Sequence, residues 1–308
     1  MSDPARALRF NPEDGVVVRE PPGKGYGYWV GGKVYYDSIS GQYLLFYRER
    51  RPLEAGRGGR CALAVSNDGV IFNDIWSANK SEFAANSIEE GHCVRYGDRW
   101  LLYVSYEMAG TSTWRIDLME ATEPAGFDVR TRRTVLSPGD FGIEWIKDPF
   151  VMLRQDEVWM YAAVPPRAGP TVDGSAIVAR ALDATVRATS SDGSHFPEIE
   201  YVFEAPLDDS WHGRRARLNS VIDWNDGFVA FYDGGRTVYD NYEEKTGIAV
   251  SPDGVKFTRV ENRSPWVESA YGNVRYVCAV RVESDVFFYY EYTVEDGSHE
   301  LRVNRITP

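Results

Sequence analysis

The sequence has few cysteines and no long apolar run. Its three cysteines, Cys61, Cys93 and Cys278, are odd in number and lie within or beside apolar segments, as buried thiols in a reducing compartment do. No stretch of roughly 18 apolar residues could span a membrane, and the first residues lack the basic start and apolar core of a secretion signal. We therefore expect no disulfide, no membrane partner and a cytoplasmic protein.

Positive charge is also scarce, since 34 Lys and Arg face 46 Asp and Glu and the formal charge is -12. Nucleic-acid and acidic membrane partners are recognised by clustered Lys and Arg, so we expect neither partner. His and Cys show no zinc-ligand spacing, and the Gly-rich stretch 56–60 does not precede a helix as a phosphate loop would. The sequence therefore predicts no metal site and no cofactor.

Helical periodicity is missing as well. No long stretch places apolar residues at i, i+3, i+4 and i+7, so helix should be rare. Aromatic residues are plentiful instead, with 19 Tyr, 14 Phe and 9 Trp, and 28 Gly and 16 Pro separate short apolar segments. This pattern predicts an all-β protein made of short strands and tight turns.

A repeated unit runs along the whole chain. Each unit has a strand, a tight turn and a second, strongly apolar strand. The second strands begin 57, 59, 69 and 58 residues apart, at Tyr43, Trp100, Trp159, Phe228 and Val286. Repeats of this length indicate one structural unit that recurs around or along the molecule.

A second marker, S-x-D-G-x-x-F, recurs with these strands. It occurs at 66–72, 190–196 and 251–257, and a degenerate copy lies at 123–127. The Asp-Gly pair suits a turn with positive φ, and the Phe is expected to pack the outer strand of each unit. Because the motif recurs on several units, we interpret it as structural.

Five units of about four strands each predict a five-bladed β-propeller that forms a single domain, residues 1–308. The last unit is one strand short, and residues 15–19 form a strand without a partner. We expect this N-terminal strand to complete the fifth blade and close the ring, which removes an exposed sheet edge. The predicted blades are residues 30–80, 88–130, 145–200, 215–262 and 272–308.

The first strand of each blade should begin at the central channel. Counting back ten or eleven residues from each second strand places five ionisable residues there: Lys33, Glu90, Asp148, Arg217 and Arg275. Two carboxylates and three cations in one small cavity indicate a functional site. The alternative is structural, namely that the two arginines neutralise the two carboxylates in a buried ion-pair network.

The five blades, the S-x-D-G-x-x-F turns and Lys147-Asp148-Pro149 at the head of the third blade resemble the five-bladed glycoside hydrolases of families 32, 43, 62, 68, 117 and 130. The resemblance implies that Asp148 orients a sugar and tunes the general acid. Those families place a base or nucleophile on the inner strand of the first blade. Here that strand reads Trp29-Val30-Gly31-Gly32-Lys33 and has no acid.

Glycoside hydrolysis ordinarily uses two carboxylates, about 5–5.5 Å apart for retention and about 6.5–9.5 Å apart for inversion. Glu90 and Asp148 are the pair that the predicted channel positions supply. We therefore predict these two as the catalytic residues of a glycosidase-like enzyme that acts on a small carbohydrate or glycoconjugate.

Three further residues are predicted to contact substrate. His92 follows Glu90 by two positions and either donates to substrate or is a hydrogen-bonded structural histidine, since a lone His is a weak metal signal. Trp145 precedes Asp148 by three positions and either stacks on a sugar or packs in the core. His212 is expected on the loop that enters the fourth blade.

The cations leave two other functions open. Phosphate, as in a phosphorylase of the family 130 type, or an anionic substrate group could be held by Lys33, Arg215, Arg217 and Arg275, the arginines through bidentate contacts. A non-hydrolytic propeller, either a carbohydrate-binding protein or an enzyme recruited to different chemistry, is the remaining alternative. The family resemblance allows a channel calcium ion, but no ligand set in the sequence indicates one.

Overall fold

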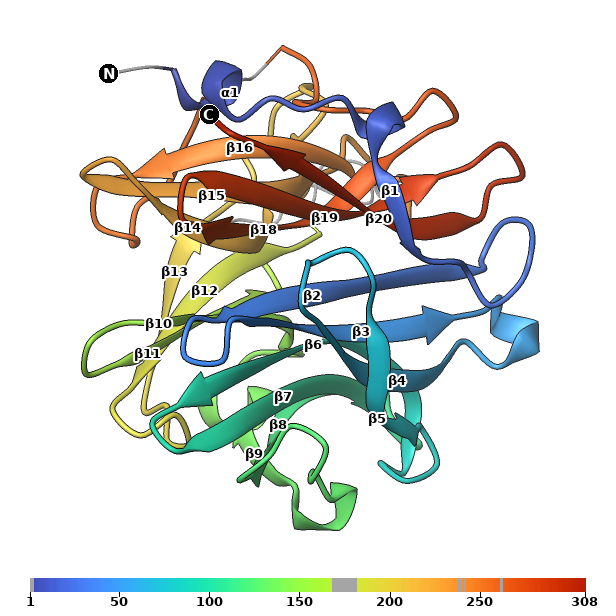
Figure 1. Ribbon diagram of the computed structural model, residues 1–308, viewed down its shortest axis with the longest axis vertical. Helices are drawn as coiled ribbons and strands as arrows, with labels where there is room; N and C mark the ends of the chain where they lie inside the picture. The colour runs from blue at the N-terminus through green and yellow to red at the C-terminus, as the bar shows by residue number, and fades with distance from the viewer. Residues whose placement is uncertain (1–2, 168–181, 238–239, 241, 261–262) are drawn as a thin grey trace.

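Antiparallel strands are the main regular secondary structure of the computed structural model, which describes residues 3–167, 182–237, 240, 242–260 and 263–308 (Figure 1). The helical elements with both ends in the described residues are α1 (Pro4–Ala7) and short 3-10 turns at Pro12–Asp14, Leu53–Ala55, Val129–Thr131 and Pro138–Phe141. Within the described residues no helix is both long enough and apolar enough to cross a membrane.

Three separate sheets each contain four antiparallel strands. We number the groups of four strands in chain order, and these three sheets are the second, third and fourth groups. The second group consists of β6 (Ala85–Tyr96), β7 (Arg99–Met108), β8 (Trp114–Ala121) and β9 (Arg133–Leu136). The third group consists of β10 (Lys147–Leu153), β11 (Val158–Val164), β12 (Ala184–Ser190) and β13 (Ile199–Phe203). The fourth group consists of β14 (Arg217–Trp224), β15 (Gly227–Gly234), β16 (Lys245–Ser251) and β17 (Thr258–Arg259).

A fourth sheet has eight strands and combines two antiparallel groups. The first group consists of β2 (Trp29–Asp37), β3 (Gln42–Arg50), β4 (Gly58–Ser66) and β5 (Asn73–Asn79). The fifth group consists of β18 (Val274–Val282), β19 (Asp285–Thr293), β20 (His299–Ile306) and β1 (Val16–Arg19). One parallel residue pair, Trp29 with His299, joins the two groups. Divided at this pair, the described strands fall into five groups of four, and the five-blade count is our interpretation of that division.

The N-terminal strand completes the fifth group, as predicted. In β1, Val16 pairs with Val303 and Val17 with Arg302, so the first strand of the chain lies antiparallel to the last (Figure 1). Without β1, the outer edge of β20 would present unpaired backbone groups, which promote aggregation. The pairing therefore closes the molecule with a segment from the opposite end of the sequence.

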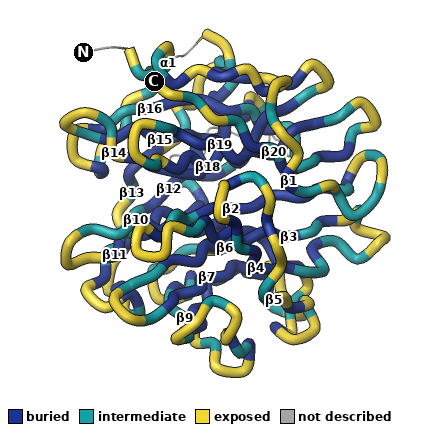
Figure 2. The backbone as a smooth tube through the Cα atoms, in the orientation of Figure 1, coloured by how far each residue is buried: buried dark blue, intermediate teal, exposed yellow. Residues whose placement is uncertain are grey.

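The apolar second strands form the core. In β7, for example, Leu101, Leu102, Tyr103 and Val104 are all 0% exposed. A strand that is covered on both faces reads as a continuous apolar run rather than an alternation, which explains why these segments stand out in the sequence. The same contrast is visible along the backbone, where buried strands lie inside and exposed loops lie at the surface (Figure 2).

The three S-x-D-G-x-x-F motifs form three turns of the same type. In the first, the Ser66 hydroxyl accepts a hydrogen bond from the Gly69 amide (2.9 Å), and the Asp68 carboxylate accepts from Val70 (2.8 Å) and Ile71 (2.9 Å). Gly69 has φ +74°, and Gly193 and Gly254, its equivalents, have φ +73° and +74°. Positive φ is accessible to Gly without a steric cost, which is why the motif contains it.

Each of these turns is also tied to a neighbouring group of strands. Three buried tyrosine hydroxyls donate to the carbonyl oxygen of the turn glycine: Tyr289 to Gly69 (2.8 Å), Tyr103 to Gly193 (2.6 Å) and Tyr161 to Gly254 (2.9 Å). Each bond joins strands that are not paired in a sheet. The turn motif therefore fixes how adjacent groups pack, which supports its structural interpretation.

Gly254→Ala should destabilise the protein more than Gly97→Ala. Both glycines have positive φ, +74° and +66°, so both substitutions carry a backbone cost of about 1–2 kcal/mol. A Cβ at Gly254 would lie 2.8 Å from Trp159 and 2.9 Å from the Tyr161 hydroxyl, whereas Gly97 has no atom within 4 Å. We expect about 1–3 kcal/mol of additional loss at Gly254, measured by urea unfolding. Equal losses would contradict the proposed contact between groups.

Candidate active site

The inner strands of the second to fifth groups each shift register with the next strand near the middle of the molecule, and β6 has a further shift near its start, between Ala85 and Ser87. Such bulges release residues from the ladder and redirect their side chains. Asp148 and Tyr276 have φ +58° and +53°, which is uncommon for non-glycine residues. The residues at the shifts near the middle are Glu89 and Glu90, Asp148 and Pro149, Asn219, and Tyr276 and Val277.

Glu90, one of the two predicted catalytic residues, is 0% exposed. Its Oε1 lies 3.2 Å from Arg48 Nε, and its Oε2 lies 3.7 Å from Lys33 Nζ. Neither oxygen has a hydrogen-bond partner, because these contacts are ionic without hydrogen-bond alignment. Burial raises the pKa of the Glu90 carboxyl, while Lys33 and Arg48 act against the increase and the charges of Glu291 and, to a lesser degree, Asp148 add to it. The carboxyl therefore favours its protonated form more than an exposed Glu does.

Asp148, the other predicted catalytic residue, is 1% exposed at the bulge of β10. Its Oδ2 faces two cations, Arg217 Nη1 at 3.4 Å and Lys147 Nζ at 3.8 Å. Its Oδ1 is buried and has no hydrogen-bond partner. Oδ2 of Asp148 is thus paired with positive charge, whereas Oδ1 is an acceptor without a donor.

The two arginines predicted to contact substrate, Arg217 and Arg275, bind carboxylates that were not among the predicted site residues. Arg217 donates to Asp233 (2.7 Å), and Arg275 donates to Glu244 (2.6 Å) and Glu291 (2.8 Å). Arg217 also contacts Asp148, so it belongs to the site and to the network. The contacts of Arg275 are those of a buried ion-pair network, and its predicted substrate contact has no direct support from this geometry.

Tyr276 is surrounded by positive charge. The distances from its ring centroid are 4.2 Å to the Arg217 guanidinium, 5.3 Å to those of Arg48 and Arg275, and 5.9 Å to Lys33 Nζ. An aromatic face attracts cations through its quadrupole. The ring therefore stabilises four like charges that would otherwise repel one another across the centre of the molecule.

The two predicted histidines have structural contacts. His92 Nδ1 accepts a hydrogen bond from the Val151 amide (2.9 Å), and the ring stacks on Phe150. His212 Nδ1 is hydrogen-bonded to the Tyr232 hydroxyl at 2.9 Å. Burial, reinforced by Lys33, lowers the pKa of His92 to about 3, and burial lowers the pKa of His212 to about 4. Both are therefore neutral near pH 7.

Trp145, predicted to stack on a sugar, lies on the segment before β10 and is half-buried. Its ring centroid is 5.9 Å from Lys147 Nζ, and the same ammonium is 5.0 Å from the centroid of Trp114. Since Lys147 also contacts Asp148, Trp145 lies two contacts away from a predicted catalytic carboxylate. Sugar stacking by Trp145 stays a prediction.

Several buried residues of the site were missed, although the sequence contains a signal for them. The residue five positions after the start of each apolar second strand is Arg48, Ser105, Val164, Asp233 or Glu291. Four of these five are polar, and each is at most 1% exposed. A polar residue that regularly ends a buried apolar strand indicates a second ring of site residues. Glu89, Glu244, Asn219 and Tyr276 have no comparable signal.

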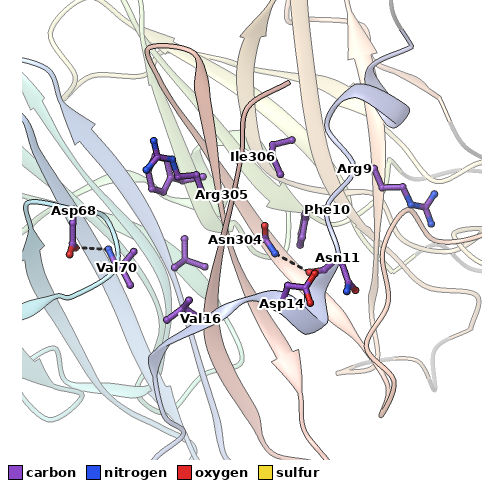
Figure 3. Close-up of a pocket in the computed structure, with 12 residues that line it drawn as sticks. Arg9, Phe10, Asn11, Asp14, Val16, Asp68, Val70, Asn304, Arg305 and Ile306 are labelled. Carbon is purple, nitrogen blue, oxygen red and sulfur yellow. Dashed lines mark hydrogen bonds between the residues drawn. The ribbon is translucent and has the colours of Figure 1, made fainter.

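A cavity of about 520 Å³ lies away from these residues, where the N-terminal segment crosses β19 and β20 (Figure 3). Its walls include Phe10, Val16 and Phe287, and the Asn304 side chain donates to the Asn11 carbonyl across it (2.9 Å). None of the eight predicted site residues lines this cavity. Among the described residues, no group of three His, Cys, Asp or Glu is arranged to hold a metal ion.

The chain resembles known proteins in its fold but not in its sequence. No family defined by sequence matches the chain, and no curated protein matches it. Solved structures do match: a family 43 β-xylosidase/α-arabinofuranosidase from a compost microbial metagenome, in complex with xylotriose, has a TM-score of 0.68 at 12% identity and covers 95% of each chain. A family 43 enzyme from Xanthomonas citri, complexed with xylose, has a TM-score of 0.66 at 12% identity over 94% of this chain and 90% of that one.

A putative glycoside hydrolase from Parabacteroides distasonis has a TM-score of 0.64 at 15% identity and covers 98% of each chain. These neighbours are glycoside hydrolases with the propeller fold. The all-β propeller predicted from the repeats is therefore confirmed. At this level of identity the likeness establishes the fold, and the chemistry has to be argued from the residues.

Acidification should destabilise the protein through its buried histidines. The folded pKa of His92 is about 3, below the ordinary value of 6.5, so the unfolded chain binds a proton there that the native state excludes. The stability that this group supplies is present above about pH 6.5 and is lost as the pH falls toward 3. His92→Gln should reduce the slope of unfolding free energy between pH 6.5 and 5 by up to about 1.4 kcal/mol per pH unit, measured by urea titration. An unchanged slope would contradict the neutral, buried assignment.

Proposed function

We propose that the protein is a glycoside hydrolase-like enzyme that acts on a small carbohydrate or glycoconjugate, with Glu90 and Asp148 as its catalytic carboxylates. The fold is that of glycoside hydrolases, which makes the class plausible but does not decide it. The observation that carries the proposal is the set of unused acceptors: both oxygens of Glu90 and Oδ1 of Asp148 are buried and lack hydrogen bonds. A fully satisfied structural network would not leave them so.

The two carboxylates differ as a general acid and its partner do. Burial raises the pKa of Glu90, which suits a group that must hold a proton near neutral pH and pass it to the leaving glycosidic oxygen. Asp148 has Oδ2 against Arg217 and Lys147, while its Oδ1 is buried without a hydrogen-bond partner. In this scheme Glu90 protonates the leaving oxygen, while Asp148 Oδ1 either orients the sugar or accepts a proton from the attacking water.

The cations near these carboxylates suit a polar or anionic sugar. Lys33 Nζ is buried without a hydrogen bond, so it retains donors for a ligand. Arg217 bridges Asp148 and Asp233 through its two terminal nitrogens, and its Nε is buried without a hydrogen-bond partner, so Lys33 has more donors available to a ligand than Arg217 has. Lys33 is therefore the substrate-binding cation that we rank first.

Phosphorolysis is the second candidate, and Lys33 is the reason. The first group has a lysine where a hydrolase of the resembling families has an acid. A cation with unused donors at that position could hold phosphate, which would then replace water as the attacking group. A sugar-binding protein without catalysis is the third possibility, and it predicts binding that survives removal of either carboxylate.

Asp148→Asn and Glu90→Gln should each lower kcat by about 10²- to 10⁴-fold, the usual contribution of a carboxylate in acid–base catalysis. The measurement is release of the aryl group from a panel of aryl glycosides, beginning with β-xylosides and α-arabinofuranosides, with and without inorganic phosphate. Turnover that requires phosphate would identify the phosphorylase.

Asp117→Asn is the matched control for this experiment. Asp117 is also 1% exposed, is paired with an arginine and has one oxygen, Oδ1, without a hydrogen-bond partner, but it lies on β8 and is not among the residues at the register shifts of the inner strands. It therefore tests whether an unpaired buried oxygen is enough to indicate catalysis. It should lose stability and keep kcat. Equal rates for the wild type, Asp148→Asn and Glu90→Gln would remove the catalytic assignment.

Asn219 is predicted to contact the substrate. It is 1% exposed at the bulge of β14, and neither its Oδ1 nor its Nδ2 has a hydrogen-bond partner. Burying an unpaired polar group costs about 1–3 kcal/mol, so a bound ligand is a reasonable partner. Asn219→Ala should lower kcat/KM about tenfold or more with little loss of stability.

Asn273 is the control for this variant, because it is equally buried but donates to Glu243 (2.7 Å) and Tyr242 (3.3 Å). Asn273→Ala should lose stability, seen as a lower urea midpoint, and keep kcat/KM. If Asn219→Ala behaves in the same way, Asn219 is a structural residue.

A further inference from the structure

Ser105 joins the two bulges that carry the catalytic candidates. Its hydroxyl donates to the carbonyl oxygen of Glu90 (2.7 Å) and accepts from the amide of Asp148 (3.1 Å). Ser105 is 0% exposed, so both bonds are made without competition from water. One side chain on β7 therefore holds the backbone of both candidates, although they belong to different sheets.

The location of Ser105 follows from the register. Val104 pairs with Gly91 and Tyr106 with Ile88, so residue 105 faces two residues of β6, Glu89 and Glu90, which is one more than a regular ladder would place there. Bulge residues are not held by a regular ladder, and their backbone groups need other partners. Pro149 has no amide to give to the ladder, which leaves the Asp148 amide as the donor of that bulge.

Ser220 makes the same kind of bridge elsewhere in the molecule. Its hydroxyl donates to the Val277 carbonyl (2.8 Å) and accepts from the Ala279 amide (3.0 Å), and it is also 0% exposed. Cys278 has the equivalent role toward the first group, since its Sγ accepts from the Val34 amide (3.4 Å). Bridges of this kind are thus a general means of joining neighbouring groups. At Ser105 the joined residues are the catalytic candidates themselves.

We propose that Ser105 is a positioning residue that sets the separation of the Glu90 and Asp148 carboxylates. The proposal rests on the function proposed above. A general acid and its partner carboxylate work only at a defined spacing, and a displacement of about 1 Å can cost on the order of 10²-fold in rate. A residue hydrogen-bonded to both backbones controls this spacing directly. The ion pairs of Glu90 fix only the Glu90 side chain, and those of Asp148 fix only the Asp148 side chain.

The first measurement needs no substrate. Glutamate labelled with ¹³C at the side-chain carboxyl is incorporated, the Glu90 signal is identified by its loss in Glu90→Gln, and its titration is followed by NMR. In Ser105→Ala the two bulges are no longer tied, so the negative charge of Asp148 is no longer held at a fixed distance from Glu90 and the midpoint should move from its wild-type value. Ser220→Ala should leave the midpoint in place.

The second measurement is kinetic, on the best aryl glycoside of the panel. Ser105→Ala should lower kcat about tenfold with KM changed less than twofold, and the basic limb of its pH profile should shift with the Glu90 midpoint. Both serine variants remove two buried hydrogen bonds, so their urea midpoints should fall by similar amounts. The Ser220→Ala variant thus removes the loss of stability from the comparison.

Ser105→Cys keeps the test usable if Ser105→Ala does not fold. A thiol fills the bridging role at Cys278 in this protein, so the variant should fold and give a midpoint and a kcat between those of wild type and Ser105→Ala. The proposal is overturned if the Glu90 midpoint moves equally, or not at all, in the Ser105 and Ser220 variants. Absence of glycosidase activity in wild type would refute the proposed function instead, because the titration measures the positioning separately.

Discussion

Charges that are removed from water must be paired, and this constraint organises the centre of the molecule. Glu291, for example, accepts from Arg48 (2.9 Å) on the first group and from Arg275 (2.8 Å) on its own group. Glu244 lies in the same way between Arg275 (2.6 Å) and Arg217 (3.5 Å). Because each partner comes from a different part of the chain, the network can form only when the groups of strands are correctly assembled. Breaking one such pair would leave an uncompensated buried charge, which is far more costly than the pair itself is favourable.

The carboxylates of this network differ in their hydrogen bonds and in the direction of their pKa shifts. Glu291 and Glu244 have hydrogen bonds from arginines, and the surrounding positive charges lower their pKa values. Glu90 is equally buried but receives only ionic contacts, and its pKa is raised. The direction of the pKa shift thus differs between equally buried carboxylates, because Glu90 has no hydrogen bond from an arginine and the negative charges of Glu291 and Asp148 act on it together with burial. Networks built only for stability have no reason to keep such a difference, whereas acid–base chemistry requires it.

The arrangement of the strands was predictable from the sequence because it depends on a regular pattern. The apolar segments that begin at Tyr43, Trp100 and Phe228 lie in β3, β7 and β15, since a strand covered on both faces must be apolar throughout. The need for β1 followed from counting strands. Both inferences use only periodicity and the rule that sheet edges must be paired.

The site was less predictable because its geometry depends on bulges and on long-range pairing. A bulge shifts the register by one residue without changing the apolar pattern. Spacing along the sequence therefore predicts Arg275 at the site but does not indicate Tyr276, the next residue, which lies at the bulge. Arg48 and Glu291 are 243 positions apart, and nothing local links them. The orphaned amide of Asn219 is visible only when its surroundings are known.

The pairing of β1 with β20 also has a consequence for how the chain folds. Val16 and Val303 are among the first and last residues of the sequence, so their contact closes a loop of nearly the whole chain. The entropy of closing a loop grows only slowly with its length, so this contact does little harm to stability. It does affect timing, because non-local contacts form late and slow the folding reaction. During synthesis, β1 therefore stays without its strand partner until β20 has been made.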